Sequence, residues 1–234
     1  MKLQRLYSYV RRALEDYDMI HEGDRVALGI SGGKDSLTLL YALAGLRRFY
    51  PQQFELVAIT VDLGYEGFDL TRIRELCDSL QVEYHVVNTR IKDMIPEGEC
   101  SLCARLRKGA FDAKAMELQC NKIAYAHNMD DVVETMMLSL IYEGRFSTFW
   151  PVTPYEDTNL TLIRPMLYVP LADVLGFQKK YLLPVTKNPC PYDGITQRSY
   201  VRDLLSQINR HAPGVKKRMM TAIQNGNLEG WEKI

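Results

Sequence analysis

The stretch Ser31-Gly32-Gly33-Lys34-Asp35-Ser36 decides the fold of this chain. It follows the apolar run of residues 25–30, which predicts a buried parallel strand, and it precedes residues 37–48, whose apolar positions recur at helical spacing. A strand, a glycine-rich loop and a helix in this order present backbone N–H groups and the positive end of a helix dipole to an anion. The stretch therefore predicts a phosphate site, in which Lys34 adds a mobile positive charge. The alternative is a plain helix-opening turn with Ser31 as its N-cap.

An acid inside this loop distinguishes it from the common nucleotide-binding loop. The Walker pattern has an early glycine where this chain has Leu28, and it continues after its lysine with Ser or Thr, where this chain has Asp35. An acid in a phosphate loop is unfavourable unless it caps the helix or holds a metal ion. Ser-Gly-Gly-x-Asp-Ser after a strand resembles the signature of the PP-loop ATP pyrophosphatases. That resemblance implies that ATP binds on residues 31–36 and is cleaved to AMP and pyrophosphate, with Asp35 helping to hold Mg²⁺.

Composition and charge limit the class of protein. The chain has 234 residues, 47% of them hydrophobic, which is enough for one large domain or a domain with an appendage. No apolar stretch reaches membrane-spanning length and the first residues lack a signal-peptide region, so we expect a cytoplasmic protein without membrane contact. The 29 basic and 29 acidic residues balance, but residues 195–234 are locally basic. That bias fits either phosphate-backbone binding or a solvated helical face.

Strand-like and helical segments alternate along the chain. Strands are predicted at residues 25–30, 56–61, 82–87, 122–126 and 160–163, with helices between them at 37–48, 68–80, 103–118 and 130–142. This alternation predicts an α/β fold, a doubly wound parallel sheet with ligands at the carboxyl ends of its strands. Further helices are predicted at 171–181, 198–210 and 214–224. The predicted parts are an N-terminal helix (1–20), a PP-loop ATP-binding domain (21–169) and a small helical C-terminal extension (170–234).

Residues at the strand ends are the best candidates for ligand contacts in such a sheet. Asp62 ends the second strand and either contacts the nucleotide or begins the loop as a cap. His127 follows the fourth strand and is either an ATP ligand or a packed histidine. Asp130 and Asp131 open the next helix, where we expect one of them to be the N-cap. Arg164, after the fifth strand, is either an ATP-phosphate contact or an ordinary exposed arginine.

Five cysteines in a chain expected to be cytoplasmic argue against a disulfide framework. Cys100 and Cys103 form a Cys-x-x-Cys that opens a helix, a position that lowers thiol pKa values and favours metal binding or catalysis. Cys190 lies far downstream and is the third candidate. Cys77 and Cys120 are predicted to be small packed residues.

Three uses of Cys100, Cys103 and Cys190 compete. A structural zinc site needs a fourth ligand, from His127 or one of the two packed cysteines. A redox pair of Cys100 and Cys103 needs no metal at all. A 4Fe–4S cluster needs only three cysteines and leaves one iron open. Composition alone slightly favours zinc.

A series of short motifs decides between these uses by resemblance. In order along the chain come Cys100-Ser-Leu-Cys-Ala-Arg-Leu-Arg-Lys-Gly109, His127-Asn-Met-Asp-Asp-Val-Val-Glu-Thr135, Ile163-Arg-Pro165 and the late Cys190-Pro. Together they resemble the tRNA 2-thiocytidine synthetase family, whose members activate a tRNA base oxygen with ATP and replace it with sulfur. The resemblance implies a 4Fe–4S cluster on the three cysteines, whose open iron carries the sulfide. It also implies tRNA as substrate, with cytidine 32 of the anticodon loop as target, a sulfur donor and a possible homodimer.

One departure from the family pattern bears on the substrate. Family members often have a second cysteine shortly after the late one, where this chain has Tyr192 and Asp193. The Cys-Pro-Tyr form also resembles the sister group that thiolates uridine-type bases. That group carries zinc-binding cysteine pairs at both ends, which this sequence lacks, so the cytidine interpretation is preferred. A cluster-free PP-loop ligase of the lysidine or NAD synthetase type is the other alternative.

Several roles follow for single residues. Lys34 and the loop amides would stabilise the departing pyrophosphate. Arg107 lies one helical turn after Cys103 on the same face, where it would stabilise developing charge. By resemblance, Asp131 handles protons or positions a metal. The candidates for contact with the tRNA backbone are the basic residues Arg105, Lys108, Lys114, Arg198, Arg202, Arg210, Lys216, Lys217 and Arg218.

Overall fold

The computed structural model describes residues 1–96, 98–186, 189–190 and 197–234. Its centre is a six-stranded sheet in the order β3-β2-β1-β4-β6-β5. The strands are β1 (Asp24–Gly29), β2 (Phe54–Asp62), β3 (Glu83–Asn88), β4 (Lys122–Ala124), β5 (Val152–Pro154) and β6 (Thr161–Ile163). The predicted doubly wound α/β sheet is confirmed, because the chain moves outward from β1 to β3 and then crosses to β4 on the other side.

The sequence predicted a wholly parallel sheet, but one pair of strands is antiparallel. The edge strand β5 pairs antiparallel with β6, through the register Val152 to Ile163. β5 was not predicted, because Pro151 precedes it and Pro154 ends it, and proline usually marks a break in a strand. The four-residue helix α4 (Ile91–Met94) was missed because four residues are too few to show helical spacing.

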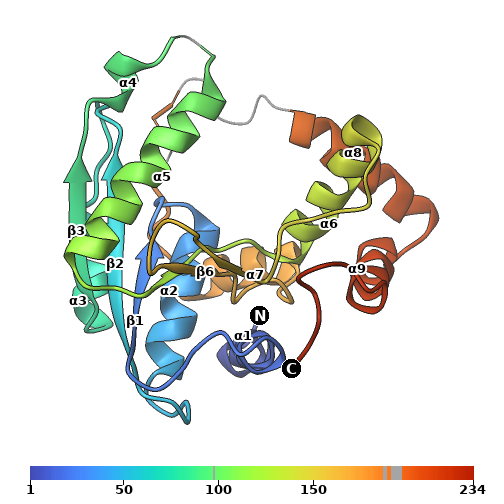
Figure 1. Ribbon diagram of the computed structural model, residues 1–234, viewed down its shortest axis with the longest axis horizontal. Coiled ribbons are helices and arrows are strands. Elements are labelled where there is room, and N and C mark those ends of the chain that lie inside the picture. The colour runs from blue at the N-terminus through green and yellow to red at the C-terminus, as the bar shows by residue number, and fades with distance from the viewer. Residues whose placement is uncertain (97, 187–188, 191–196) are drawn as a thin grey trace.

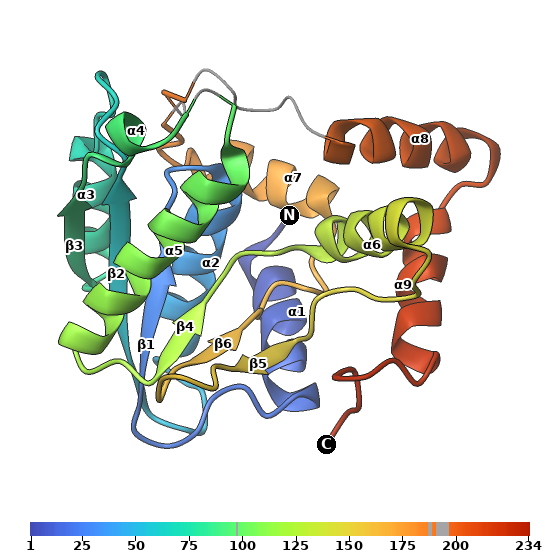
Figure 2. The same ribbon diagram turned by 45° about the horizontal axis from the view of Figure 1, so that its top comes forward.

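Helices cover both faces of the sheet (Figures 1 and 2). One face packs against α1 (Leu3–Asp16), α2 (Lys34–Leu46), α3 (Thr71–Ser79) and α7 (Leu171–Tyr181), and this core includes the fully buried Leu6, Leu40 and Phe177. The other face packs against α5 (Cys100–Glu117), whose Phe111 and Ala115 meet Ala27 and Ile59 of the sheet. These two cores hold the central strands, and with them their carboxyl ends, in fixed positions beside α5.

A second group of helices lies beside the sheet, on the side of β4, β6 and β5 (Figure 2). It consists of α6 (Met129–Leu138), its π-helical extension η1 (Ser139–Glu143), α8 (Gln197–His211) and α9 (Val215–Asn225). Buried acids of α6 hold the two C-terminal helices: Arg202 forms two bonds to Glu134, at 3.0 and 3.1 Å, and Lys216 lies 2.7 Å from Asp130. The division at residues 20 and 169 stays a prediction; α1 and α7 share a core with α2.

No helix in the part of the chain that the structure describes is long and apolar enough to span a lipid bilayer.

Candidate active site

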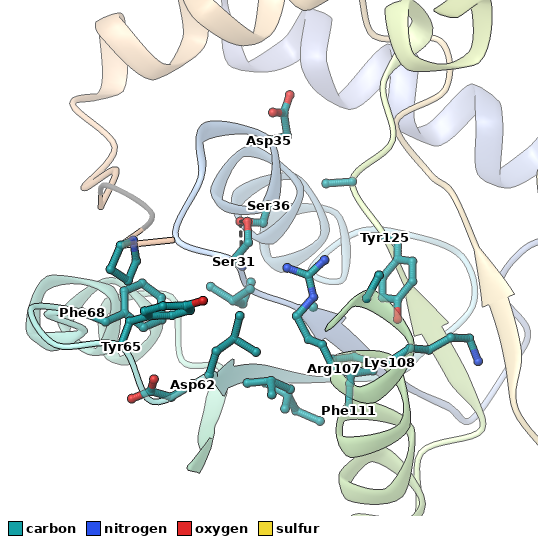
Figure 3. Close-up of a pocket in the computed structure, with 18 of the residues that line it drawn as sticks. Ser31, Asp35, Ser36, Asp62, Tyr65, Phe68, Arg107, Lys108, Phe111 and Tyr125 are labelled. Carbon is teal, nitrogen blue, oxygen red and sulfur yellow. Dashed lines mark hydrogen bonds between the residues drawn. The ribbon is translucent and has the colours of Figure 1, made fainter. Parts of the chain in front are cut away.

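A cavity of about 490 Å³ opens at the carboxyl ends of β1, β2 and β4 (Figure 3). It lies where the chain changes direction across the sheet, with β2 on one side of β1 and β4 on the other, which is where open α/β sheets bind ligands. Seven residues singled out from the sequence line it: Ser31, Asp35, Ser36, Asp62, Arg107, Lys108 and His127. The loop, the strand ends and helix α5 are therefore brought together as the sequence predicted.

The glycine-rich loop is closed by its own hydrogen bonds. Ser36 Oγ accepts from the Ser31 N–H at 3.2 Å and donates to the Gly33 carbonyl at 3.0 Å, while Ser31 Oγ accepts from the Gly33 N–H at 3.3 Å. Gly32 has a φ of +78°, a left-handed conformation that other residues rarely adopt. The N-cap of α2 is Gly33, so Ser31 is not the cap of a plain helix-opening turn.

Asp35 is held from two sides in the first turn of α2. Lys34 Nζ lies 2.7 Å from Asp35 Oδ2, and the side-chain amide of Asn128 donates to Asp35 Oδ1 at 3.0 Å. The helix N-terminus also favours a negative charge there. Gly32, Gly33 and Lys34 are not among the residues that line the cavity, although Lys34 touches Asp35, which does. The acid in the loop is thus a fixed carboxylate at the cavity wall.

The start of α6 differs from the prediction. Its N-cap is Asn128, whose side-chain oxygen accepts from the N–H groups of Asp130 at 2.9 Å and Asp131 at 3.2 Å, so the expectation of a cap at Asp130 or Asp131 is wrong. The helix begins one residue earlier than expected, which places both acids in its first turn. Asp130 accepts from the Leu171 N–H and pairs with Lys216, both at 2.7 Å.

Asp131 completes a capping box, because its Oδ2 accepts from the Asn128 N–H at 2.9 Å. Burial raises the pKa of Asp131 to about 6, with smaller contributions from the negative charges of Asp35 and Glu134. Its carboxyl group can therefore gain or lose a proton near neutral pH. This property suits the proton-handling role that the resemblance implied for it.

His127 is a neutral hydrogen-bond donor at the cavity wall. Burial, and secondarily the charge of Arg164, lowers the pKa of His127 to about 3. Arg164 Nε lies 3.2 Å from His127 Nδ1. Because arginine can only donate, Nδ1 must be the acceptor, and the ring proton of a neutral His127 is then on Nε2.

Arg164 is buried, with 8% of its surface exposed, so the interpretation as an ordinary exposed arginine is wrong. It also donates to Thr153 Oγ1 at 3.0 Å and to the Trp150 carbonyl, and it stacks over Phe149. It does not line the cavity, so its place is behind His127.

Four aromatic residues of the cavity had no role in the sequence interpretation. Tyr65 and Phe68 lie together on one side, and Phe111 and Tyr125 on the other, with Arg107 reaching between Ser31 and Tyr125 (Figure 3). Tyr65 and Phe68 belong to the loop that follows Asp62, whose Oδ1 accepts from the Gly64 N–H at 2.8 Å. Asp62 is therefore both a loop-starting cap and a cavity residue. The usable signal was two aromatic residues in the loop after a strand end.

The three candidate cysteines do not line the cavity themselves, but they are chain neighbours of residues at its α5 end that do. α5 begins at Cys100, Cys103 lies one turn later, and Cys190 follows Pro189, which lines the cavity. Burial raises the pKa of Cys103, the charge of Arg107 opposes this, and Cys190 and Cys100 add to the rise. The predicted lowering of the pKa is therefore wrong for Cys103, since burial outweighs the helix terminus. The mutual influence also indicates that the three thiols are near one another.

The other two cysteines are packed, as predicted. Cys77 is fully buried, Cys120 is 6% exposed, and they belong to different cores. Neither is available as a fourth zinc ligand. Among the described residues, no group of three or more His, Cys, Asp or Glu side chains is arranged to hold a metal ion.

Most of the predicted tRNA-binding cations have partners within the protein. Lys108 lies 2.6 Å from Asp112 and over the ring of Tyr155, and Lys114 lies 2.6 Å from Glu117. Arg198 donates to Thr135 at 3.2 Å, and Arg218 donates to two backbone carbonyls at the start of its own helix. Arg202 and Lys216 hold α8 and α9 to α6, as described above. The exposed members without an ion pair among the described residues include Arg105, Arg210 and Lys217.

This loop, above a cavity at the switch point of the sheet, defines a PP-loop protein, and the family model of the PP-loop domain matches residues 4–208. The tRNA-cytidine(32) 2-sulfurtransferase of Citrifermentans bemidjiense is 38% identical over 229 residues, which cover 94% of this chain and 90% of that protein. The chain therefore belongs to the tRNA-cytidine(32) 2-sulfurtransferase family, which confirms the resemblance seen in its motifs.

Two solved structures extend this result. The U34-tRNA thiolase NcsA from Methanococcus maripaludis, solved with its 4Fe–4S cluster, has a TM-score of 0.79 and 27% identity, over 97% of this chain and 80% of that one. The NH3-dependent NAD synthetase from Campylobacter jejuni has a TM-score of 0.52 and 16% identity, over 97% and 95% of the two chains. The second similarity shows a shared fold alone.

Proposed function

We propose that this chain is an ATP-dependent tRNA sulfurtransferase that adenylates the carbonyl oxygen of a cytidine base and replaces it with sulfur. The observation that carries this proposal is that one cavity is bounded by the PP-loop and by the cysteine-bearing end of α5. An adenylate formed at the loop would lie within the same cavity as the side chain of Arg107. Family membership supports the same reaction and the same position in tRNA, cytidine 32.

The first half of the reaction uses the loop. ATP would place its phosphates on residues 31–36, and the base oxygen would attack the α-phosphorus, so that the bond to pyrophosphate breaks. The loop amides and Lys34 would stabilise the charge on the leaving pyrophosphate. Asp35, with Asp131 behind it, supplies the carboxylates that Mg²⁺ uses together with phosphate oxygens. The Asp62 carboxylate remains as an acceptor for the nucleotide, and the Nε2–H of His127 remains as a donor.

The second half uses the cysteines. Cys100, Cys103 and Cys190 are three cysteine side chains beside one end of the cavity, a donor set suited to iron and sulfide. They would hold a 4Fe–4S cluster, for which three cysteine ligands suffice. Such a cluster supplies a site from which sulfur reaches the activated carbon. Arg107 would then stabilise the negative charge that develops as AMP departs with the base oxygen.

The partners follow from this chemistry. tRNA would approach over the open side of the cavity, where Arg105 on α5 is exposed, and over α8 and α9, where Arg210 and Lys217 are exposed. A sulfur donor must restore the sulfide after each turnover. We also propose a cytoplasmic location, where ATP and tRNA meet, and a homodimer, as the resemblance implied.

A second candidate reaction is thiolation of a uridine-type base. The similarity to the U34-tRNA thiolase NcsA favours it, because that protein shares most of its length with this chain. The two reactions differ in the base that enters the cavity and not in the chemistry of the loop.

The test is nucleoside analysis of tRNA from a strain that lacks this chain, complemented with wild type, Cys103→Ser or Cys120→Ala. We expect 2-thiocytidine to be absent, and to return with wild type and Cys120→Ala but not with Cys103→Ser. Loss of 2-thiouridine-type bases alone would instead support the second candidate. Unchanged thiolation in the deletion strain would contradict both.

A further inference from the structure

Asn128 connects the PP-loop to the start of α6 through both ends of its side-chain amide. Asn128 Oδ1 accepts from the N–H groups of Asp130 and Asp131, and Nδ2 donates to Asp35 Oδ1 at 3.0 Å. The residue is 2% exposed, and its own N–H donates to Asp131 Oδ2. Asp35 of the PP-loop and Asp131 of α6, on helices far apart in sequence, are therefore both bonded to one buried residue.

The orientation of this amide is fixed by its partners. Two backbone N–H groups can only be satisfied by an oxygen, so the NH₂ end must face Asp35. A hydrogen bond from an amide to a carboxylate is charge-assisted and directional, and in a buried place it constrains the acceptor. Asp35 Oδ2 pairs with the neighbouring Lys34, so Asn128 determines the direction of the other oxygen.

Capping alone does not require asparagine at this place. Ser, Thr and Asp serve as N-caps about as well, since each offers an oxygen to the first N–H groups of a helix. Asp has no donor for Asp35 when ionised, and Ser is too short to make both contacts. The second contact is thus the property that distinguishes asparagine from the other capping residues.

We propose that Asn128 is a positioning residue that orients the Asp35 carboxylate for Mg²⁺-bound ATP. The inference rests on the proposed function in its nucleotide-binding half, and it concerns neither tRNA nor sulfur. Asn128 itself does not line the cavity, so it acts through Asp35, which does.

The test compares nucleotide affinity and stability in the full-length protein. Asn128→Ser and Asn128→Asp both keep an oxygen for the helix cap. The matched control is Asn121→Ser, because Asn121 also joins a carboxylate, Asp24 at 2.7 Å, to a backbone N–H, that of Arg25 at 2.9 Å. That pair lies at the amino ends of the strands, away from the cavity. The probe is α,β-methylene-ATP with Mg²⁺, which cannot be cleaved, measured by calorimetry alongside thermal unfolding.

We expect Asn128→Ser to weaken binding about tenfold or more at pH 7.5, the effect of losing a hydrogen bond to a charged group. Asn121→Ser should bind as wild type does. The melting temperature of Asn128→Ser should stay within a few degrees of wild type, as for one N-cap exchanged for another. Wild-type affinity in Asn128→Ser would overturn the proposal and leave a helix cap only.

Asn128→Asp adds a pH readout that a cap would not give. The new carboxyl would face Asp35 and Lys34 from α2, Asp131 and Glu134 from its own helix, and Arg198 from α8. Crowding with Asp35 raises its pKa, and in its protonated form it can again donate to Asp35. The nucleotide affinity of Asn128→Asp, divided by that of wild type, should therefore be lowest at pH 8.5 and recover several-fold at pH 5.5. The same ratio for Asn128→Ser should not change with pH.

Three results would contradict the proposal: a ratio for Asn128→Asp that does not change with pH, tighter binding of this variant at high pH, or affinity that falls only in proportion to unfolding. The proposed function fails separately, if wild type binds the nucleotide but the deletion strain keeps all its thiolated bases.

Discussion

The two sides of the cavity are built in different ways. The nucleotide wall, defined as residues 31–36 with Asn128 and Asp131 behind them, is closed by hydrogen bonds and supported by the sheet. The cysteine wall, defined as Cys100, Cys103, Arg107 and Cys190, consists of exposed or half-buried side chains from the start of α5 and from a distant segment. The PP-loop of the first wall is thus fixed by local structure, whereas its contact with Asn128 and the whole of the second wall depend on how remote parts of the chain meet.

Thr186, which precedes Cys190 in the chain, contacts the PP-loop. The Thr186 N–H donates to the Gly32 carbonyl at 3.0 Å, and Thr186 Oγ1 donates to the Asp69 carbonyl at 3.3 Å. The chain is therefore attached to the PP-loop at Thr186, a few residues before Cys190. The hydrogen bonds of the nucleotide wall hold its groups in place, and groups held in this way stabilise charge without rearrangement during the reaction.

The largest effect is expected when the positive charge of Lys34 is removed from the nucleotide wall. This change should affect the reaction of ATP and leave the cysteine wall as it is. In Lys34→Ala, tRNA-dependent release of pyrophosphate from ATP should fall by about 10²- to 10³-fold, the effect of losing one preorganised charge at a reacting centre. The iron content and the absorbance near 400 nm of anaerobically purified protein should be unchanged. Lys179→Ala, an exposed change on α7, is the control. Loss of iron in Lys34→Ala would show that the two walls are not independent.

The next effect probes the cysteine wall with two arginines of α5. Arg107 lines the cavity and Arg105 is exposed outside it. Arg107→Gln should slow thiolation at saturating ATP by about tenfold to a hundredfold, because it removes one group that stabilises developing charge. Arg105→Gln should change only the affinity for tRNA, with a smaller dependence on salt. Single-turnover thiolation and tRNA binding at two salt concentrations distinguish them; equal thiolation rates in both variants would remove Arg107 from the mechanism.

The same difference explains what the sequence could predict. The PP-loop part of the nucleotide wall is contiguous in sequence, so its strand, loop and helix were predictable from residues 25–48, and the positions of Asp62 and His127 followed from the strand ends. Among the six strands only β5 was missed: β4 and β6 also have three residues, but β5 is preceded by a proline and ends in one.

The errors concern burial and long-range pairing, which spacing does not report. Cys103 was expected to have a lowered pKa because it opens a helix, but burial at the cavity reverses the direction. Arg202 and Lys216 stay predicted tRNA contacts, and the fold adds that each also meets a buried acid of α6. The role of Asn128 could not be predicted from its motif, because its partner Asp35 lies far away in sequence and meets it only in the fold.

The smallest expected effect tests whether the buried carboxyl group of Asp131 lowers the stability of the folded protein. The pKa of Asp131 is about 6 in the folded protein, against an ordinary value of 3.8. The folded state therefore holds this proton more tightly than the unfolded state, and stability falls as pH rises from about 4 to 6, then stays at the lower level. Asp131→Asn cannot ionise and keeps an oxygen for the Asn128 N–H. It should be more stable than wild type by about 1–3 kcal/mol at pH 7.5 and nearly equal near pH 4.

Urea unfolding of both proteins at the two pH values measures this difference, and the measurement near pH 4 is the internal control. The same variant should release less pyrophosphate from ATP, because the group that can exchange a proton near neutral pH is gone. Greater stability together with lower activity would mean that Asp131 serves the reaction and lowers the stability of the folded protein. A variant that is less stable at both pH values would instead make Asp131 a structural part of the capping box, and the contrast between the two walls would lose its functional meaning.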